Sequence, residues 1–284
     1  MPTPFTNQAT LSYNGLSVLS NIASGELVQV LTAAKNAAQG TYLSNDTVTY
    51  TVSLINSGTA NLTGLTVTDD LGGYTFGANT VYPLRFRDGS QLYYVNGTLQ
   101  PAPAVTAGPP LTFTGINIPA GGNAMLVYEA DVTNYAPLGA TDSITNTATV
   151  TGTGISAPIT AQESIAAGTE PALEIAKSMS PTSVTENGTL TYTFVISNLG
   201  NTAAEAGAGV TVSDTFNPVL NNISVTLNGA PLPAGSYSYN PATGAFSTTA
   251  GVITVPAATY AQDAATGAYT ITPGTATLTV SGTV

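Results

Sequence analysis

Two amino-acid types that could react with each other occur at matching places in two halves of the sequence. The only two lysines are Lys35 and Lys177, and each half also carries an aspartate in a similar short segment, Asp69 and Asp214. Side chains alternate between the faces of a β-strand, so residues two apart share a face. By this rule each lysine and each aspartate shares its face with aliphatic neighbours. The pattern predicts that each half points one Lys and one Asp into its own core.

An asparagine completes each set. Asn146 lies in a Thr-rich segment, and it shares its face with the aliphatic residues of that segment. Asn7 lies near the start of the chain in a similar segment. The residues that share its face are Phe5, Ala9, Leu11 and Tyr13. Each of the two cores is therefore expected to receive one Lys, one Asp and one Asn.

These three side chains together could form an internal amide bond. Burial lowers the pKa of an amine and raises that of a carboxylic acid, so a buried pair favours its neutral forms. A neutral Lys amine can attack the Asn side-chain carbonyl while the acid polarises it and carries protons, which releases ammonia. We assign Lys35–Asn146 assisted by Asp69, and Lys177–Asn7 assisted by Asp214. The alternative is an ordinary buried hydrogen-bonded cluster, which satisfies the same polar groups.

The elements that carry these residues are repeated. The short alternating runs between Gly, Pro and Asn turns are typical of antiparallel strands in a β-sandwich. A weak helical pattern over 16–36 is discounted. We therefore predict an all-β chain with two tandem antiparallel β-sandwiches. The repeated segments are "AKNAAQGTYLSNDTVTYTVSLINSG" (34–58) with "AKSMSPTSVTENGTLTYTFVISNLG" (176–200), "GLTVTDDL" (64–71) with "GVTVSDTF" (209–216), and "GNAMLVYEADV" (122–132) with "GTATLTVSGTV" (274–284).

The first copy continues into a last strand that the second copy lacks. This strand, "ITNTATVTGTG" (144–154), matches "FTNQATLSYNG" (5–15) at the start of the chain. The predicted organisation is a donor strand (1–14), a linker (15–30), a complete sandwich (31–154), a second linker (155–171) and an incomplete sandwich (172–284). We expect the vacancy to lie beside residues 275–284, without a neighbouring strand from the same molecule.

A donor strand from another copy could fill this vacancy. Such a contact is heterologous and does not close on itself, so it propagates a head-to-tail filament. The Lys177–Asn7 bond would then join one subunit covalently to the next. The alternative is that the N-terminal strand folds back into its own second domain, which gives a closed monomer.

The motifs resemble those of the conserved-repeat family of bacterial surface proteins, the domain of unknown function numbered eleven. They are "AAKN", "NDTVTYTVSLINSG" and "LTVTD" in the first copy, and "IAKS", "NGTLTYTFVISNLG" and "VTVSD" in the second. The resemblance covers nearly the whole chain. It implies immunoglobulin-like sandwiches in extracellular fibres, stalks or walls, and no catalytic function. The Lys, Asp and Asn sets are also similar to those of Gram-positive pilin and adhesin domains that form isopeptide bonds.

Composition argues against several other functions. A net charge of −11 disfavours nucleic acid, and the absence of His and Cys removes the usual zinc ligands and the Ser-His and Cys-His dyads. No cofactor or metal is expected, because neither acidic group has the dense ligand spacing of a calcium loop. No apolar run approaches the roughly 18–20 residues that cross a bilayer, so membrane insertion is not expected. The two acidic groups are Asp69 with Asp70, and Glu129 with Asp131 and Asp142.

The sequence therefore predicts a structural subunit of a self-assembling extracellular fibre, either pilus-like or an endospore appendage. Its partners are other copies of itself, and its only chemistry is self-catalysed bond formation. The N-terminus shows no signal peptide, which favours assembly in a sporulating mother cell and release by lysis, although a virus-encoded fibre fits the same observation. The alternative is an adhesin or stalk fragment acting as a monomeric binding module, which a pocket with ordered acidic or aromatic groups would favour.

Overall fold

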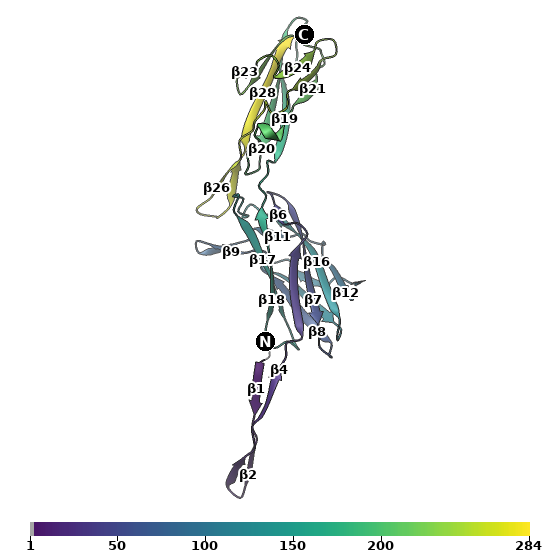
Figure 1. Ribbon diagram of the computed structural model, residues 1–284, viewed down its shortest axis with the longest axis vertical. Helices are drawn as coiled ribbons and strands as arrows, with labels where there is room; N and C mark the ends of the chain where they lie inside the picture. The colour runs from purple at the N-terminus through teal and green to yellow at the C-terminus, as the bar shows by residue number, and fades with distance from the viewer. Residues whose placement is uncertain (1–2) are drawn as a thin grey trace. The chain divides into compact units, whose positions relative to one another are not determined.

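The computed structural model describes residues 3–284, and strands make up almost all of the regular structure in this range (Figure 1). The described residues include one short 3₁₀ helix, η1 (Ala206–Ala208), and no helix long and apolar enough to cross a membrane. They form two compact units, the first made of residues up to Gly40, Asn45–Thr133 and Ile144–Ile165, and the second of Thr41–Ser44, Asn134–Ser143 and Ala166–Val284. The predicted all-β fold with two antiparallel sandwiches is confirmed.

One sheet of the first domain carries Lys35 on its edge strand. The inward side chains of its long strands are buried and the outward ones are more exposed, as alternating sequences require. In order across the sheet, the strands are β13 (Thr98–Gln100), β12 (Leu92–Val95), β16 (Asn123–Val132), β7 (Thr47–Asn56) and β5 (Leu31–Ala37), with β11 (Leu84–Phe86) also paired to β16.

The other sheet of the first domain carries Asp69 and Asn146 on neighbouring strands. The pairs β14 with β15, β15 with β8 and β8 with β17 are antiparallel, and β18 with β6 is parallel. Its order is β14 (Ala104–Thr106), β15 (Leu111–Ile118), β8 (Leu62–Asp69), β17 (Ser143–Thr151), β18 (Ile159–Ala167) and β6 (Thr41–Tyr42). A separate two-stranded hairpin joins β9 (Tyr74–Phe76) to β10 (Asn79–Val81).

The second domain repeats this plan with fewer strands. Its first sheet has the order β19 (Leu173–Ser180), β20 (Thr189–Asn198), β28 (Gly274–Thr283), β22 (Asn221–Leu227) and β23 (Ala230–Pro231). Its second sheet has only β21 (Ser213–Thr215), β25 (Ala245–Thr248) and β24 (Tyr237–Asn240). A further hairpin joins β26 (Thr259–Gln262) to β27 (Tyr269–Thr272).

The open edge of the second domain is not where the sequence predicted it. Residues 275–284 were expected to lack an internal neighbour, but β28 pairs with β20 on one side and β22 on the other. The prediction was wrong because strands that are consecutive in sequence need not lie in the same sheet. In the first domain, β16 and β17 belong to different sheets.

The unpaired edge belongs to β21. In the first domain its counterpart β8 pairs with β15 on one side and β17 on the other. Within the described residues β21 pairs with β25 alone, at Asp214 opposite Phe246. β21 is also only three residues long, against eight for β8, as expected for a strand held from one side. The second sandwich therefore lacks its last strand, as predicted.

The N-terminal segment folds back on itself instead of standing as a single strand. β1 (Thr3–Asn7) pairs with β4 (Ala23–Leu27), and β2 (Thr10–Tyr13) pairs with β3 (Leu16–Leu19), all drawn in purple in Figure 1. Asn14 and Gly15 make the turn with φ of 45° and 78°, a conformation that Asn-Gly favours in two-residue hairpins. The segment 15–30, predicted to be a linker, thus contains two strands. The second predicted linker, 155–171, contains β18.

Candidate functional site

The first domain encloses an ion pair between Lys35 and Asp69. Lys35 extends from the edge strand β5, and Asp69 stands at the end of β8 in the opposite sheet. Both residues are buried, with relative exposures of 4% and 0%. Lys35 Nζ donates to Asp69 Oδ2. The predicted inward orientation of both side chains is therefore what the structure shows.

Two further donors hold the Asp69 carboxylate. The hydroxyl of Tyr128 donates to Oδ2, the same oxygen that faces Lys35. The backbone N–H of Leu71 donates to Oδ1 at 2.9 Å, and Leu71 adopts a left-handed φ of 52° to do so. Non-glycine residues seldom adopt this conformation unless their surroundings require it. The carboxylate is thus fixed in place before any reaction.

Aromatic rings surround the lysine amine and separate it from water. Lys35 Nζ lies 4.9 Å from the centroid of the Tyr50 ring and 5.8 Å from that of Tyr128. Burial lowers the pKa of Lys35 below its ordinary value of 10.5, and the negative charge of Asp69 only partly opposes this effect. Burial also raises the pKa of Tyr128, and the charge of Asp69 raises it further, so this hydroxyl stays protonated and acts as a donor.

Asn146 is the third buried member of the site. It lies on β17, two residues from Ala148, which stands opposite Asp69 in the sheet. Its side chain is fully buried, and neither its amide nitrogen nor its amide oxygen makes a hydrogen bond of normal geometry. The Asn146 side chain also lowers the pKa of Tyr128, although burial and Asp69 raise it by more. This effect places the Asn146 amide near the Tyr128 hydroxyl. The structure thus brings the three predicted residues of the first domain together.

A second buried asparagine shows how unusual this state is. Asn56 is also fully buried, but its Nδ2 donates to the carbonyl oxygens of Ala60 and Pro119, both at 2.9 Å. Its Oδ1 accepts from the N–H of Gly58 at 3.0 Å. A buried amide without partners costs free energy, so nearly all such groups are paired in folded proteins. The Asn146 amide therefore calls for an explanation that Asn56 does not.

The second domain has the same ion pair in a more open setting. Lys177 Nζ contacts Asp214 Oδ2, but the lysine side chain is 41% exposed. Its amine lies 4.7 Å from the Tyr192 ring centroid and 5.8 Å from that of Phe216, so aromatic rings are present here as well. The predicted third member, Asn7, is exposed on β1, where it pairs with Ala23. The Lys177–Asn7 assignment stays a prediction.

Tyr128 and Leu71 are not among the site residues predicted from the sequence. Tyr128 could have been found by parity, because it points inward from a strand of small and aliphatic residues and stands opposite Tyr50. The equivalent position in the second domain is Val280, opposite Tyr192. An alignment of the two repeats therefore does not show a tyrosine shared at this position. The left-handed backbone of Leu71 leaves no signal in residue type.

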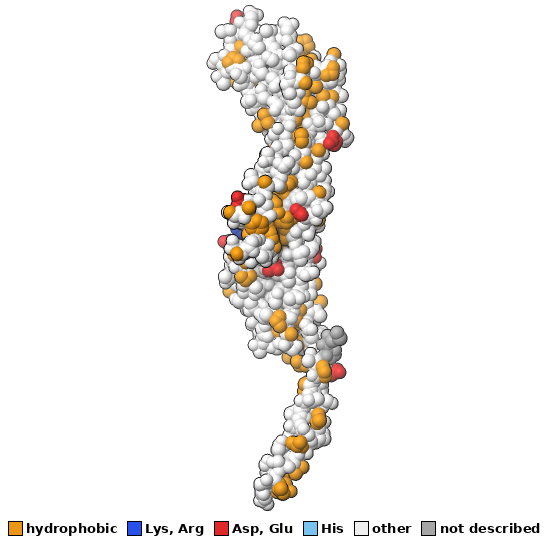
Figure 2. Space-filling model, turned by 90° about the vertical axis from the view of Figure 1, so that its left-hand side faces the viewer, with side chains coloured by type: hydrophobic (Ala, Val, Ile, Leu, Met, Phe, Trp, Pro, Cys, Tyr) orange, Lys and Arg blue, Asp and Glu red, His pale blue; other side chains and the backbone are white. Residues whose placement is uncertain are grey.

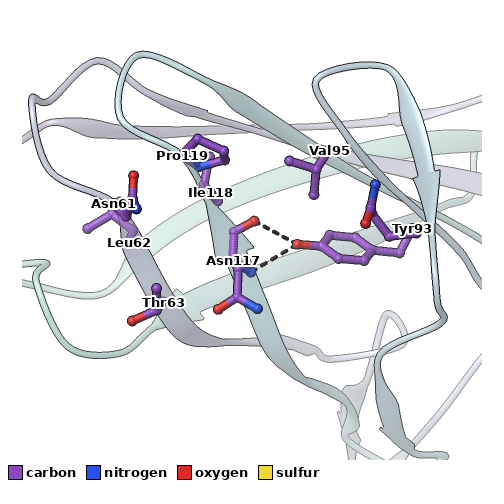
Figure 3. Close-up of a pocket in the computed structure, with 9 residues that line it drawn as sticks. Asn61, Leu62, Thr63, Tyr93, Val95, Asn117, Ile118 and Pro119 are labelled. Atoms are coloured by element: carbon purple, nitrogen blue, oxygen red, sulfur yellow. Dashed lines mark hydrogen bonds between the residues drawn. The ribbon is translucent and has the colours of Figure 1, made fainter.

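A surface pocket in the first domain offers no comparable chemistry. Figure 3 shows the Tyr93 hydroxyl inside it, donating to the Asn117 carbonyl at 2.7 Å and accepting from the Asn117 N–H at 2.9 Å. None of the nine described residues that line it is charged. The hydroxyl is already occupied, so the pocket does not favour the predicted alternative of a binding module. The lining residues are Asn61, Leu62, Thr63, Tyr93, Val95, Gln100, Asn117, Ile118 and Pro119.

The remaining acidic residues do not gather into a metal site. Arg87 contacts Asp131 at 2.9 Å and Glu129 at 3.3 Å, and Arg85 contacts Asp131 at 3.3 Å. No group of three His, Cys, Asp or Glu side chains within residues 3–284 is placed to hold a metal ion. Of the acidic residues considered for calcium, Asp69, Glu129 and Asp131 are partners of basic side chains. Asp70 and Asp142 accept hydrogen bonds from backbone N–H groups.

No protein-family model matches the chain, and no curated protein matches its sequence. The resemblance to the conserved-repeat family therefore stays a prediction. The chain is similar to the major pilin subunit BcpA of Bacillus cereus (12% identity, 95% of this chain and 66% of that one, TM-score 0.38). It is also similar to the major pilin SpaD of Corynebacterium diphtheriae (14%, 85% and 58%, TM-score 0.36) and the pilus backbone protein RrgB of Streptococcus pneumoniae (10%, 86% and 55%, TM-score 0.33). The chain thus spans between about half and two thirds of the lengths of these proteins, and similarities this weak do not assign a function.

Proposed function

We propose that this protein is the structural subunit of an extracellular fibre, in which each copy completes the second domain of the next. The observation that carries the proposal is the difference between two equivalent ion pairs. Lys35 and Asp69 are enclosed by a sheet that includes β17, whereas Lys177 and Asp214 lie beside the open edge of β21. The segment that matches β17 in sequence is exposed at the N-terminus.

An isopeptide bond in the first domain accounts for the unpaired amide. A proton passes from Lys35 Nζ to Asp69 Oδ2, which converts the ion pair into a neutral amine and a carboxylic acid. The amine attacks Asn146 Cγ, a new C–N bond forms, and the bond from Cγ to Nδ2 breaks. Two protons of the amine go by way of the carboxyl group to the leaving nitrogen, which departs as ammonium (ammonia plus one proton), and Asp69 ends as the carboxylate it was at the start. The step is self-catalysed and happens once per site.

The same step between copies would join neighbouring subunits of the fibre by a covalent bond. Asn7 of one copy takes the role of Asn146, and Lys177 with Asp214 of the next copy take the roles of Lys35 with Asp69. Polymerisation is head to tail, because donor and acceptor lie in different parts of the chain. We place the fibre outside the cell or on a spore. Lys and Arg together number 4 of 284 residues, which leaves trypsin-like proteases few sites to cut. Assembly in a sporulating cell remains part of the proposal.

A mixing experiment tests strand exchange and bonding together. The Lys177→Ala chain keeps its donor Asn7, and the Asn7→Ala chain keeps its acceptor Lys177. We expect wild type to give a ladder of multimers after boiling in detergent, and each variant alone to give only monomer. A mixture of the two variants should give a covalent dimer and nothing longer, lighter than two chains by one further ammonia in intact mass.

Each other outcome has a clear meaning. If the mixture gives only monomer and wild type gives no ladder of multimers, the covalent link between copies is contradicted. A wild-type monomer that loses two ammonia molecules instead of one would indicate the fold-back alternative, in which Asn7 reacts with Lys177 of its own chain. Loss of no ammonia by either variant contradicts the Lys35–Asn146 bond.

A further inference from the structure

The donor element has two strands. We infer that the whole hairpin, residues 3–27, inserts into the next copy and adds two strands, not one, beside β21. The inference rests on the proposed function and specifies which segment of the partner copy occupies the open edge. It changes the role of residues 16–27 from a connection to a part of the next subunit's core.

The first observation is that the hairpin has one apolar face shared by both strands. Residues directly opposite each other in an antiparallel pair project to the same face. Leu11 stands opposite Val18, and Tyr13 opposite Leu16, so the predicted inward residues of the first strand continue onto the second. The other face of this part is mostly polar, and Ser12 Oγ and Ser17 Oγ form a hydrogen bond across it at 3.1 Å.

This apolar face is exposed in the single chain. Phe5, Leu11, Tyr13, Leu16 and Val18 are each more than half exposed. Figure 2 shows hydrophobic side chains along this hairpin at the surface of the molecule. Residues 3–27 contain one charged residue, Glu26. A small amphipathic hairpin with an uncovered apolar face is marginally stable by itself and requires a partner surface.

The second observation is that the first domain finishes its sheet with two strands. Beyond β8 come β17 and then β18, and both contribute to the buried core. Their buried aliphatic residues are Ile144, Ala148 and Val150 from β17, and Ile159, Ala161, Ile165 and Ala167 from β18. The second domain lacks a counterpart of both strands within the described residues, because β21 ends its sheet.

The third observation is that the edge strand β19 is uncovered along its whole inward face. In the first domain, Leu31 on β5 is fully buried, and Lys35 is nearly so. At the same repeat position as Leu31, Leu173 is 40% exposed, and Ile175 and Met179 on the same face are exposed by 58% and 48%. The Lys35–Asp69 ion pair places β5 opposite the end of β8, on the side where β17 and β18 extend that sheet. A single added strand would leave part of this face open.

The fourth observation is a sequence match beyond the first strand. "NIASG" (21–25) is similar to "SIAAG" (164–168), which ends β18 and stands just before β19. Gly25 lies six residues before Leu31, and Gly168 lies five residues before Leu173. The second strand of the hairpin therefore has the same relation to the following domain as β18 has. The repeat that is displaced to the N-terminus includes both strands.

Matched substitutions in the full chain test the second strand. Val18→Asp places a carboxylate on the apolar face of the hairpin, and Leu19→Asp places one on the opposite face of the same strand. Leu11→Asp is the reference for a blocked first strand. We expect Val18→Asp and Leu11→Asp to reduce the yield of multimers by more than about tenfold, because an unpaired carboxylate would be buried. Leu19→Asp should polymerise like wild type, and loss of one ammonia should show that the first domain is intact in every variant.

A covalent lock on the hairpin tests the same inference without blocking the core. The Ser12→Cys/Ser17→Cys chain would carry the only two cysteines of the protein, at a pair whose oxygens are already 3.1 Å apart on the polar face. If the hairpin inserts whole, the oxidised chain polymerises as fast as the reduced one. Polymerisation that requires reduction, or Val18→Asp polymerising like Leu19→Asp, overturns the two-strand insertion while leaving strand donation intact. A wild-type chain that stays monomeric contradicts the proposed function itself.

Discussion

The two domains carry the same lysine and aspartate at the same repeat positions, yet only one pair is enclosed. The difference does not come from the strands that bear them, since Lys35 and Lys177 both sit on edge strands paired in the same register to the next strand. It comes from the opposite sheet. In the first domain β17 and β18 extend that sheet beyond β8, and within the described residues no strand takes their place beside β21 in the second domain.

One buried asparagine has the same partners by position in both domains. Asn56 and Asn198 are both fully buried, and they share three equivalent backbone partners. Asn198 Nδ2 donates to Thr202 O at 2.8 Å and Pro256 O at 3.0 Å, and its Oδ1 accepts from Gly200 N–H at 2.9 Å. The second domain is therefore a well-formed sandwich that is open along one edge. The comparison indicates that the lysine and aspartate of each domain are held by strands that both domains have, whereas their burial differs with the strands that only the first domain has.

The largest expected difference between the domains concerns the aspartates. In the Asn146→Ala background, where the Lys35 amine is not consumed, Asp69→Ala removes the partner of a buried lysine and should lower the free energy of unfolding of the first domain by about 3–5 kcal/mol. Asp214→Ala breaks a pair that is partly in water and should cost about 1 kcal/mol or less in the monomer. Calorimetry of both variants, with intact mass to count the ammonia lost, measures the two effects. Equal losses would show that exposure does not distinguish the two pairs.

A pair of matched leucines should give the next largest difference. Leu31 and Leu173 stand opposite Asn56 and Asn198 in equivalent strands, with exposures of 0% and 40%. Leu31→Ala should destabilise its domain by about 2–5 kcal/mol because it leaves a cavity, whereas Leu173→Ala should cost less than about 1 kcal/mol in the monomer. In assembled fibres the cost of Leu173→Ala should rise toward that of Leu31→Ala. Thermal unfolding of monomer and fibre checks both values.

Much of the first site could be predicted from the sequence because strand parity is a local property. The alternation around Lys35, Asp69 and Asn146 places each side chain on the inward face whatever the sheet order is. The position of the vacancy could not be predicted in the same way. It depends on which strands are neighbours in a sheet. β28 is the counterpart of β16 in the repeat, but it does not adjoin the open edge.

The hairpin was missed for a different reason. Asn14-Gly15 between alternating runs is a strong signal for a two-residue hairpin, but the sequence predicts a linker over 15–30, with a weak helical pattern over 16–36 that is discounted. Helical and extended patterns are hard to separate when apolar residues are spaced irregularly. Here the pairing shifts register between β3 and β4, since Leu11 stands opposite Val18 while Asn7 stands opposite Ala23. Because of this shift, the alternation of side chains between the two faces, which has a period of two, is interrupted and hard to detect in the sequence.

Tyr128 should give a smaller difference, because only the first domain has this hydroxyl. Tyr128→Phe removes a donor to the Asp69 carboxylate, and a hydrogen bond to a charged group contributes about 1.5–3 kcal/mol. We expect isopeptide formation in the first domain to slow by roughly tenfold or more, since about 1.4 kcal/mol corresponds to one factor of ten in rate. Intact mass followed over time after refolding measures this rate.

A control is Tyr192→Phe in the second domain, at the position equivalent to Tyr50. The Tyr192 hydroxyl makes only a long contact of 3.4 Å with the Asn217 carbonyl. Its loss should therefore change the rate of isopeptide formation in the first domain very little. If Tyr128→Phe forms the bond at the wild-type rate, Tyr128 is a packing residue and has no part in positioning the carboxylate.

The smallest expected effect is a pH dependence that appears only when the first bond is prevented. In Asn146→Ala the Lys35 amine is not consumed, and burial holds its pKa below the ordinary 10.5 in the folded state. Between that lowered pKa and 10.5 the unfolded chain binds more protons than the folded one, so the free energy of unfolding rises with pH. Each unit of pKa difference contributes about 1.4 kcal/mol. Below the lowered pKa, both states bind the proton and this dependence vanishes.

A second variant isolates the lysine from other groups that titrate in the same range. The raised pKa of Tyr128 acts in the opposite direction, because at high pH the unfolded chain loses that proton first and stability falls. Lys35→Met/Asn146→Ala keeps this tyrosine and lacks the amine. Subtracting its denaturation curves from those of Asn146→Ala at each pH should leave a difference that increases as pH rises toward 10.5. A flat difference would mean that the enclosed amine holds its proton as firmly as one in water, and then the first site would lack the neutral nucleophile that separates it from the second.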